Sequence, residues 1–521
     1  MPSAKPAGSR PTSAALTGVC AGCLAVAALT AAGTPADDGP VLVLANRDDD
    51  DSDGRPDADD EVVNGSDDER DLAPLEIGDT GAGVTRLRLD AGAAPLRFFQ
   101  RVDGGWRHAG LGRAMIDSRD GRGAEAEIRV ESCAWAGVPA AWSGTAGVTV
   151  VGFDGAGAEV TATRLSVRVA PVLLGAATDR VTEVFAASGR YDNADFLDRL
   201  RAILGSLDVP LTVHAAADWR EMWMQDTMEV ATASIPGSRM HVVLAGLRGA
   251  DGFPPTLLGP DTAIARVAEP RALGDGDDWA DWYGNLEVSP PLDGHPAGRV
   301  IHGRNTRTGQ TFHPEVVRFL VTQGAQAPLW IDTSWLMIKH VDEIVAFLPG
   351  PDGRGVLLVP DPEEGLRLAG RLGTDAAVVE ANRWIARRID EMLEGTDGPA
   401  RAGVVGDAAG GGRSPGLLDL LGWDRDRVIR LPLAFRVTTE GLDAGGEVTN
   451  AVTAWSSPVN SLLVNGTVIC GSADMPDTVR ETCRERFHAG GAADVVFIDD
   501  GVYQQRGGNV HCATNARRGA P

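Results

Sequence analysis

The C-terminal segment 505–515, which reads QRGGNVHCATN, contains the residue best suited to nucleophilic chemistry. Cys512 is the candidate nucleophile, because a cysteine thiolate is accessible near neutral pH when a cation lies close to it. The two glycines before it suggest a closely packed backbone, in which side chains at Gly507 and Gly508 would intrude on a cleft. A lone cysteine near a chain end is more often an ordinary buried residue, so this segment does not decide the question alone.

Three upstream stretches combine tryptophan, acidic residues and histidine. Residues 219–229 read WREMWMQDTME, residues 283–291 read YGNLEVSPP, and residues 330–343 read WIDTSWLMIKHVDE. Together with VHCATN at residues 510–515, these stretches resemble the catalytic motifs of the protein-arginine deiminase family. The resemblance extends over about residues 39–521, and its motifs are long and specific.

The resemblance implies a catalytic set of four residues. A guanidinium is a planar cation whose N–H donors form a fixed fork, so its site needs carboxylates that accept hydrogen bonds in pairs. Asp226 and Asp342 would fill that role. Cys512 would attack the guanidinium carbon, and His340 would protonate the departing ammonia and then activate water. Peptidyl-arginine would thereby become peptidyl-citrulline.

Each member of this set also has an ordinary structural interpretation. Asp226 could cap a turn, His340 could be a satisfied core histidine, and Asp342 could pair with a nearby arginine. The matching sequence on both sides of each residue favours the catalytic interpretation. His511 adjoins the nucleophile, but the resemblance gives the acid and base role to His340 and leaves His511 as a structural support.

Three further residues are expected in the substrate cleft. The resemblance implies that Trp223 forms a wall of the cleft, with ordinary core packing as the alternative. Arg248 matches an arginine that contacts the substrate peptide backbone, and Arg506 falls where another cleft arginine is expected. Plain surface charge is the alternative for both arginines.

The same resemblance implies a calcium site beneath the cleft. Its ligands would be the side chains of Gln225, Glu229 and Glu287 and the backbone carbonyls of Tyr283 and Leu286. Ligation by oxygen alone suits Ca²⁺. Because Gln225 adjoins Asp226, binding there would order the catalytic carboxylate, and we predict calcium-dependent activity.

A second calcium site is predicted in the acidic segment 46–71. This segment contains 13 carboxylates, and dense charge runs are usually solvated linkers. Against that interpretation, oxygen-bearing side chains on alternate residues before a turn at Gly54 are typical of loops that bind hard cations. The segment also resembles the calcium-binding immunoglobulin-like domain of the family. The candidate ligands are Asn46, Asp48, Asp50, Asp57, Asp59 and Asp67.

The apolar pattern predicts two architectures in succession. From about residue 75 to 174, short alternating stretches with glycine-rich breaks predict the strands of an all-β sandwich. Beyond Pro171, strands alternate with helices, including a helix over 376–394 and a strand over 461–470. For this second part the resemblance implies an α/β propeller, the pentein fold, with five pseudosymmetric ββαβ modules.

Three parts are therefore predicted along the chain. Residues 1–38 carry basic residues, an apolar run and then small residues, which is typical of a secretory signal peptide. Residues 39–172 are the predicted immunoglobulin-like sandwich, and residues 173–521 are the predicted catalytic domain. We expect a secreted, extracellular protein without a membrane span. Export would permit a disulfide, for which Cys470 and Cys483 are the most local pair.

The net charge of −25 over 521 residues argues against binding to nucleic acid or anionic membranes, which requires a basic face. The expected partners are arginine-containing proteins or peptides, and the sequence does not determine the oligomeric state.

Two other functions fit parts of the same pattern. Small-molecule guanidine deiminases, such as agmatine deiminases, also end in a glycine-rich segment before His-Cys. A secreted calcium-binding adhesion protein with an inactive deiminase-like domain is the second alternative. The stretch 223–229 and Arg248 favour a peptidyl substrate over agmatine.

Overall fold

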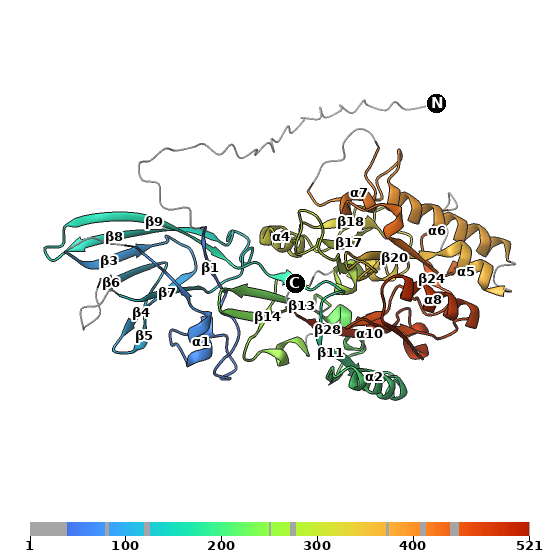
Figure 1. Cartoon of the computed structure of the whole chain (residues 1–521), viewed down its shortest axis with the longest axis horizontal. Coiled ribbons are helices and arrows are strands. Elements are labelled where there is room, and N and C mark those ends of the chain that lie inside the picture. The colour runs from blue at the N-terminus through green and yellow to red at the C-terminus, as the bar shows by residue number, and fades with distance from the viewer. Residues whose placement is uncertain are drawn as a thin grey trace, which may run out of the picture. The chain divides into compact units, whose positions relative to one another are not determined.

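The computed structural model describes residues 39–78, 83–118, 126–248, 252–270, 278–370, 375–406, 413–437 and 447–519 (Figure 1). Residues 40–521 form one compact unit. The predicted signal peptide lies outside the described residues. In the described part of the chain, no helix is both long and apolar enough to cross a membrane.

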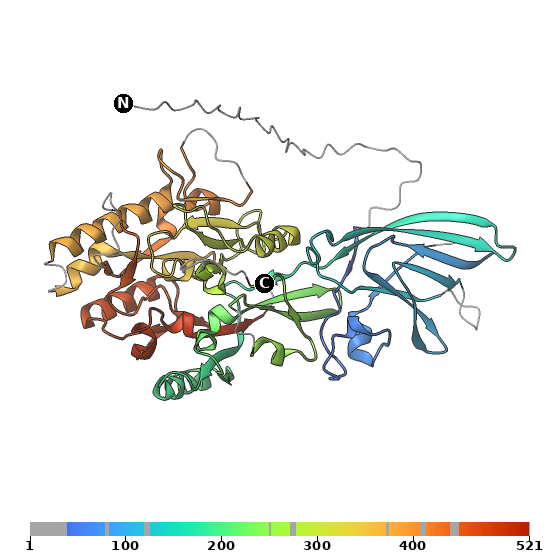
Figure 2. The ribbon, with the colours of Figure 1, turned by 180° about the vertical axis from the view of Figure 1, so that it is seen from behind.

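The N-terminal part of this unit is built from two β-sheets, which Figure 2 shows from behind. Its elements are β1 (Val41–Val43), α1 (Ser66–Asp71), β2 (Ala73–Pro74), β3 (Val84–Asp90), β4 (Leu96–Val102), β5 (Gly105–Leu111), β6 (Arg113–Asp117), β7 (Ile128–Ser132), β8 (Thr145–Asp154) and β9 (Glu159–Val169). The strand orders are β1-β9-β8-β3-β6 and β2-β7-β4-β5. Neighbours are antiparallel except β1, which runs parallel to β9. The immunoglobulin-like character of this part stays a prediction.

The remaining strands alternate with helices. The strands are β10 (Leu173–Leu174), β11 (Val181–Ser188), β12 (Leu211–Ala215), β13 (Met228–Ile235), β14 (Ser238–Ala245), β15 (Thr262–Ala265), β16 (Leu286–Val288), β17 (Val300–Arg304), β18 (Leu329–Asp332), β19 (Ala346–Leu348), β20 (Val356–Asp361), β21 (Ala402–Val404), β22 (Val428–Pro432), β23 (Phe435–Val437), β24 (Ala451–Thr453), β25 (Leu462–Val464), β26 (Thr467–Gly471), β27 (Asp494–Ile498) and β28 (Thr514–Arg518). The helices are α2 (Ala194–Ser206), α3 (Met224–Thr227), α4 (Pro314–Gln323), α5 (Pro362–Leu368), α6 (Ala376–Glu394), α7 (Leu417–Leu421), α8 (Asp477–Ala489), α9 (Gly501–Gln504) and α10 (Val510–Ala513).

Five sheets of three or four strands recur among these described elements. Their strand orders are β12-β11-β28, β10-β13-β14-β15, β16-β17-β18-β21, β19-β20-β22 and β25-β26-β27. Each contains one parallel pair, and parallel neighbours require a crossover connection. This part is therefore α/β. A five-fold axis relating the sheets stays a prediction.

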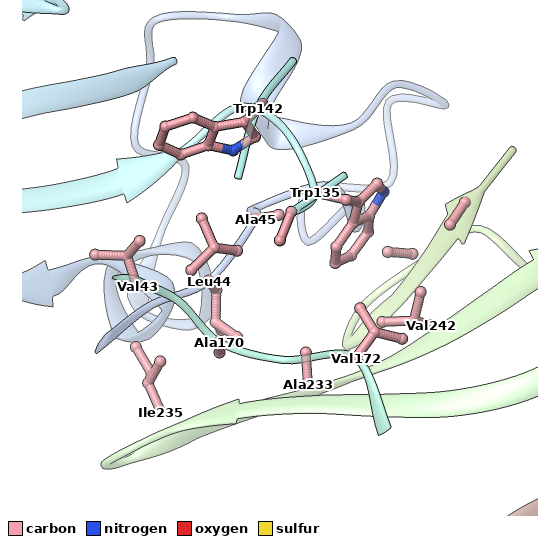
Figure 3. Close-up of a cluster of buried hydrophobic side chains, with 14 of the residues drawn as sticks. Val43, Leu44, Ala45, Trp135, Trp142, Ala170, Val172, Ala233, Ile235 and Val242 are labelled. Atoms are coloured by element: carbon pink, nitrogen blue, oxygen red, sulfur yellow. The ribbon is translucent and has the colours of Figure 1, made fainter. Parts of the chain in front are cut away.

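A continuous apolar core joins the sandwich to the first strands of the α/β part (Figure 3). Leu44, Trp135 and Val172 belong to the same buried cluster as Ala233 of β13 and Val242 of β14. Hydrogen bonds from α4 cross the same boundary. The side chain of Gln323 accepts from the Val172 N–H at 3.0 Å and donates to the Ala136 carbonyl at 3.0 Å.

The bounds of a predicted helix or strand are correct where the residues of that segment alone determine them. Helix α6 has the predicted bounds, and the Asp375 side chain caps its start by accepting from Ala377 N–H. The predicted strand over 461–470 is wrong, because it is divided into β25 and β26. Asn465 and Gly466 between them have φ of 50° and 90°, which makes a two-residue hairpin turn.

Candidate active site

Cys512 lies in the short helix α10 and lines a cavity of about 440 Å³. The helix leads directly into β28, which pairs with β11 and so ties the end of the chain to the beginning of the α/β part. Asn460 fixes the backbone here: its Oδ1 accepts from the Cys512 N–H, and its Nδ2 donates to the Asp342 carbonyl, both at 3.2 Å. Cys512 as a whole residue is 7% exposed.

Asp342 places a carboxylate against the thiol from a short 3₁₀ turn, Val341–Glu343. Its Oδ2 lies 3.4 Å from Cys512 Sγ and 3.0 Å from His511 Nδ1. Its Oδ1 is buried and has no hydrogen-bond partner among the described residues. A buried carboxylate oxygen without a donor is costly, and a guanidinium N–H would satisfy it.

Asp226 supplies the second carboxylate from α3 and is also buried. Its Oδ1 accepts from the Gly284 N–H at 3.1 Å and lies 3.6 Å from His340 Nδ1. Burial raises the pKa of Asp226, and the positive charges of Arg248 and His340 oppose that shift. The two predicted carboxylates are therefore on the same side of the α/β part, with His340 against one and Cys512 against the other.

His340 has one ring nitrogen engaged and one directed at the carboxylate. Its Nε2 is 2.7 Å from the Trp279 carbonyl, which only accepts, so Nε2 carries a proton. Nδ1 is consequently the position that gains and loses a proton. His511 instead contacts Asp342 and lies 3.7 Å from Glu287 Oε1, a geometry that suits the supporting role predicted for it.

The surroundings of the Cys512 thiol disfavour its thiolate form. Burial, followed by the negative charges of Asp342 and Asp226, raises its pKa well above that of an ordinary cysteine. A cation bound between these carboxylates would reverse the second effect and favour the thiolate. Cys470 and Cys483, the most local cysteine pair of the sequence, are both free thiols, and burial raises the pKa of each.

Gly284 is a site residue that sequence reasoning missed. A Cβ at this position would lie 2.6 Å from Asp226 Oδ1, 2.7 Å from His340 Nδ1 and 3.3 Å from Asp342 Oδ2. The three predicted catalytic groups therefore converge on one glycine. The signal in the sequence was its place in the stretch 283–291, although nothing there distinguishes it from a turn glycine.

Replacing Gly284 with alanine is expected to lower kcat/KM by about 10²-fold, because displacing aligned catalytic groups by a fraction of an ångström has effects of that order. Gly105→Ala is the matched control, since its Cβ would meet nothing within 4 Å. Steady-state kinetics and the melting temperature of both variants check the prediction. Unchanged kinetics for a folded Gly284→Ala variant would show that the three groups do not act together.

The double glycine before the nucleophile is closely packed. A Cβ on Gly508 would lie 2.3 Å from Trp223 Cζ3 and 3.1 Å from Cys512 Cβ, and one on Gly507 would lie 3.0 Å from Met337 Cε. Trp223 is buried in contact with this segment and meets Tyr503 edge-on at 5.6 Å between ring centroids. Trp223, the two glycines and Cys512 therefore lie together, and side chains at positions 507 and 508 would clash with their neighbours.

Arg248 is buried against the Asp226 carboxylate. Its Nη1 lies 3.2 Å from Asp226 Oδ2 and donates to the Arg220 carbonyl at 2.8 Å. The guanidinium stacks 3.7 Å from the ring centroid of Trp282, and 1% of its side chain is exposed. The surface-charge alternative is wrong. Arg506 is exposed, lines the Cys512 cavity and stacks on Tyr191 at 4.4 Å.

Most of the predicted cleft calcium ligands meet in a small cavity beside α3. Gln225, Glu229, Leu286 and Glu287 line it together with His511, Asn515 and Arg518. Tyr283 is fully buried and does not line this cavity. Burial, with the charge of Glu287, raises the pKa of Glu229 to about 8, and burial, with the charge of Asp342, raises the pKa of Glu287 to about 7. Two adjacent buried carboxylates and an amide oxygen fit a Ca²⁺ ion. The positive charges of His511 and Arg518 already compensate part of the negative charge that such an ion would neutralise.

The acidic segment brings some of its predicted ligands together. Asp48 and Asp50 have carboxylate oxygens within 4.8 Å of each other and of Asp261, a residue between β14 and β15. Asp48 is fully buried, and neither of its carboxylate oxygens has a partner among the described residues. Burial and the charge of Asp71 raise the pKa of Asp48 to about 9. Such a set of oxygen donors fits a hard cation.

Of the other predicted ligands of this segment, two are buried and two lie in ion pairs at the surface. Asp57 lies in a second group with Asp49 and Asp51, and Asn46 is buried with its Oδ1 unpartnered. Asp59 and Asp67 lie in surface ion pairs with Arg47 and Arg70, each at 3.0 Å, so the structure does not bring them to the buried group. Sequence reasoning missed Asp71 and Asp261. Asp71 ends the acidic run, whereas Asp261 carries no local signal.

Comparison with known proteins agrees with this site. A sequence model of the family described as protein-arginine deiminase (PAD) matches residues 159–520. The chain is 32% identical over 213 residues to human protein-arginine deiminase type-4, which covers 39% of this chain and 32% of that protein. It is 28% identical over 381 residues to mouse type-4 and to human type-3, in both cases over 67% of this chain and 54% of the relative.

Solved structures show weaker likenesses. The agmatine deiminase of C. jejuni has a TM-score of 0.41 at 10% identity and covers 67% of this chain and 96% of that one. The agmatine deiminase of Enterococcus faecalis has a TM-score of 0.40 at 12% identity, with coverage of 67% and 97%.

The chain belongs to the protein-arginine deiminase family, because the family match spans most of its length and includes every predicted catalytic residue. The chain spans about half the length, or less, of the curated relatives it matches.

Proposed function

We propose that the protein is a calcium-dependent deiminase that hydrolyses the guanidinium of peptidyl-arginine to peptidyl-citrulline and ammonia. The observation that carries this proposal is the buried Asp342 carboxylate, which lies 3.4 Å from Cys512 Sγ and keeps its second oxygen unpartnered among the described residues. A buried acceptor beside a buried thiol suits a cationic substrate whose central carbon is the point of attack.

In the first half of the reaction, the substrate guanidinium donates hydrogen bonds to Asp226 and Asp342. Its positive charge lowers the pKa of the Cys512 thiol, which burial and these two carboxylates otherwise raise. The thiol releases its proton to solvent, and the thiolate adds to the guanidinium carbon and forms a C–S bond. His340 transfers the proton on Nδ1 to the departing nitrogen, the C–N bond breaks, and ammonia leaves an amidino-thioether on Cys512.

In the second half, His340 accepts a proton from water at the same ring nitrogen. The resulting hydroxide adds to the amidino carbon, and the C–S bond breaks as the added hydroxyl becomes the ureido C=O and its proton passes to the departing Cys512 sulfur. The product is a neutral ureido group, so the carboxylates lose their cationic partner and retain the product weakly. His511 and Asn460 hold Asp342 and Cys512 in position throughout through the contacts described above.

Calcium would supply positive charge that keeps the buried carboxylates ionised and ordered. In the cleft it would be held by Gln225, Glu229 and Glu287 with the carbonyl of Leu286, all of which line one cavity. Gln225 and Asp226 are neighbours in α3, so ordering the first orders the second. In the acidic segment it would be held by Asp48, Asp50 and Asp261.

The wider organisation of the protein extends this proposal. We infer an immunoglobulin-like domain over residues 39–172 and a pentein catalytic domain over 173–521, supported by the two sheets of the first part and the five sheets of the second. We also propose export directed by residues 1–38, supported by their composition. The substrates are then arginine residues of proteins or peptides.

A substrate panel tests the peptidyl assignment. We expect an N-acylated arginine ester to be hydrolysed to its citrulline product with a kcat/KM at least about tenfold above those of free arginine and agmatine. Contacts to the acyl and ester groups, which the two smaller substrates lack, change kcat/KM by a factor of that order. Rates are measured from ammonia release at equal substrate concentrations in excess calcium. A preference for agmatine would overturn the peptidyl assignment in favour of a small-molecule deiminase.

A further inference from the structure

The cavity that contains Cys512 is lined by two exposed arginines, Arg436 on β23 and Arg506 after α9. Among the described residues, the guanidinium of Arg436 has no hydrogen-bond or ion-pair partner. Arg506 stacks on Tyr191 and donates Nη1 to the Val502 carbonyl at 2.5 Å, and no described carboxylate pairs with it. Both cations are therefore available to an anion that enters the cavity.

The chain has 73 acidic residues for 48 lysines and arginines, so carboxylates that could pair with an arginine are abundant. Elsewhere, arginines close to carboxylates are paired with them, as in the contacts of Arg388 with Glu391 and Glu447 at 2.8 and 2.9 Å. The surrounding charge would readily supply a partner to each cleft arginine. Neither cleft arginine has such a partner among the described residues, so both can bind an anion from outside the chain.

Two carboxylates, Asp474 and Glu343, also belong to the cavity lining, and neither pairs with the arginines. Asp474 is exposed, whereas Glu343 Oε1 accepts from the His340 N–H at 3.1 Å. Burial, with the charge of Asp342, raises the pKa of Glu343 to about 8. The volume of about 440 Å³ is within the range of cavities that accommodate small organic ligands, so a substrate group near the reactive guanidinium reaches the same lining.

We propose that Arg436 and Arg506 form a carboxylate subsite, so that the preferred substrate carries a carboxylate close to its reactive arginine. Arginine binds carboxylates through paired N–H donors, which gives both affinity and orientation. The carboxylate has two chemical sources: the α-carboxylate of a C-terminal arginine, or the side chain of an adjacent aspartate or glutamate. This inference rests on the proposed deiminase function and specifies its substrate class.

Three substrates separate these sources. N-acetyl-arginine carries the α-carboxylate, N-acetyl-arginine amide carries none, and the α-amide of N-acetyl-arginyl-aspartate carries only a side-chain carboxylate. We expect kcat/KM for at least one carboxylate substrate to exceed that of the amide by about tenfold, as for charge-assisted hydrogen bonds at a partly exposed site. Arg436→Gln should reduce this ratio to near one, and Arg436→Lys should retain part of it.

Arg86→Gln is the matched control, since it removes an exposed arginine of the sandwich strand β3 and should leave the ratio unchanged. Equal kcat/KM for all three substrates, or a preference that survives both Arg436→Gln and Arg506→Gln, would overturn the carboxylate subsite. Citrulline formation without any preference would leave the deiminase function intact. If no substrate is turned over, the proposed function fails, and calorimetric binding of the three compounds to Cys512→Ala still reports whether the carboxylate is recognised.

Discussion

Replacing Cys512 with alanine is expected to reduce citrulline formation from an acyl-arginine substrate by at least about 10³-fold, because the covalent route is then closed. No other described cysteine can substitute for it. Cys470 and Cys483 are fully buried, and their thiol pKa values are raised by burial. Cys133 lies in the sandwich, where burial raises its pKa to about 11. Product formation is measured by mass spectrometry of the arginine substrate.

Cys133→Ala is the matched control for this prediction. It removes a free thiol of intermediate exposure that is remote in sequence from the catalytic segments, so activity should stay within about twofold of the parent protein, as expected for a residue outside the catalytic set. The melting temperature of Cys512→Ala should be close to that of the parent. Substantial activity in a folded Cys512→Ala variant would exclude a cysteine-linked intermediate.

Removing calcium with a chelator is expected to abolish activity and to lower the melting temperature. Asp48 and Asp50 come from the acidic segment and Asp261 from the α/β part, so an ion held by all three would join the two parts. Without a cation their repulsion is relieved only by protonation, which is why burial and neighbouring charges raise the pKa of Asp48 to about 9. A bound ion stabilises the folded state by mass action.

The two calcium sites can be separated by variants with different readouts. Asp261→Asn should reduce the rise in melting temperature that calcium produces, whereas Glu287→Gln should raise the calcium concentration needed for half-maximal activity. Asp67→Asn is the matched control, since Asp67 is exposed and paired with Arg70. Scanning fluorimetry and kinetics across a calcium titration, with magnesium as the comparison ion, give both readouts. Full activity in excess chelator would contradict the calcium requirement.

The catalytic residues could be proposed from the sequence because each lies in a long, ordered motif. Asp226, Asp342 and Cys512 come from segments up to about 290 residues apart, and only the resemblance linked them. Their contacts, such as the 3.4 Å from Asp342 to the thiol, are products of tertiary packing that no local pattern encodes. Helix α6, by contrast, could be predicted to the residue, since its periodicity and its Asp375 cap are local.

The residues that sequence reasoning missed owe their roles to distant partners. Gly284 is notable because the side chains of Asp226, His340 and Asp342, all predicted to be catalytic, surround it. Asp261 is notable because its loop meets the acidic segment. Arg248 was identified, but its contact with Asp226 and the Trp282 ring depends on a fold that brings together β14, α3 and a turn near residue 282. A single residue in a loop or turn gives no indication in the sequence of the distant residues that it contacts in the fold.

The central claim, that Cys512 and its two carboxylates deiminate arginine within a peptide, is tested most directly by one measurement. An N-acylated arginine amide is incubated with the full chain in excess calcium and reductant, and its conversion to citrulline is followed by mass spectrometry. Citrulline that accumulates with the parent protein, and neither with Cys512→Ala nor in chelator, is the predicted result. No citrulline from the parent protein, with calcium present and the thiol reduced, would contradict it.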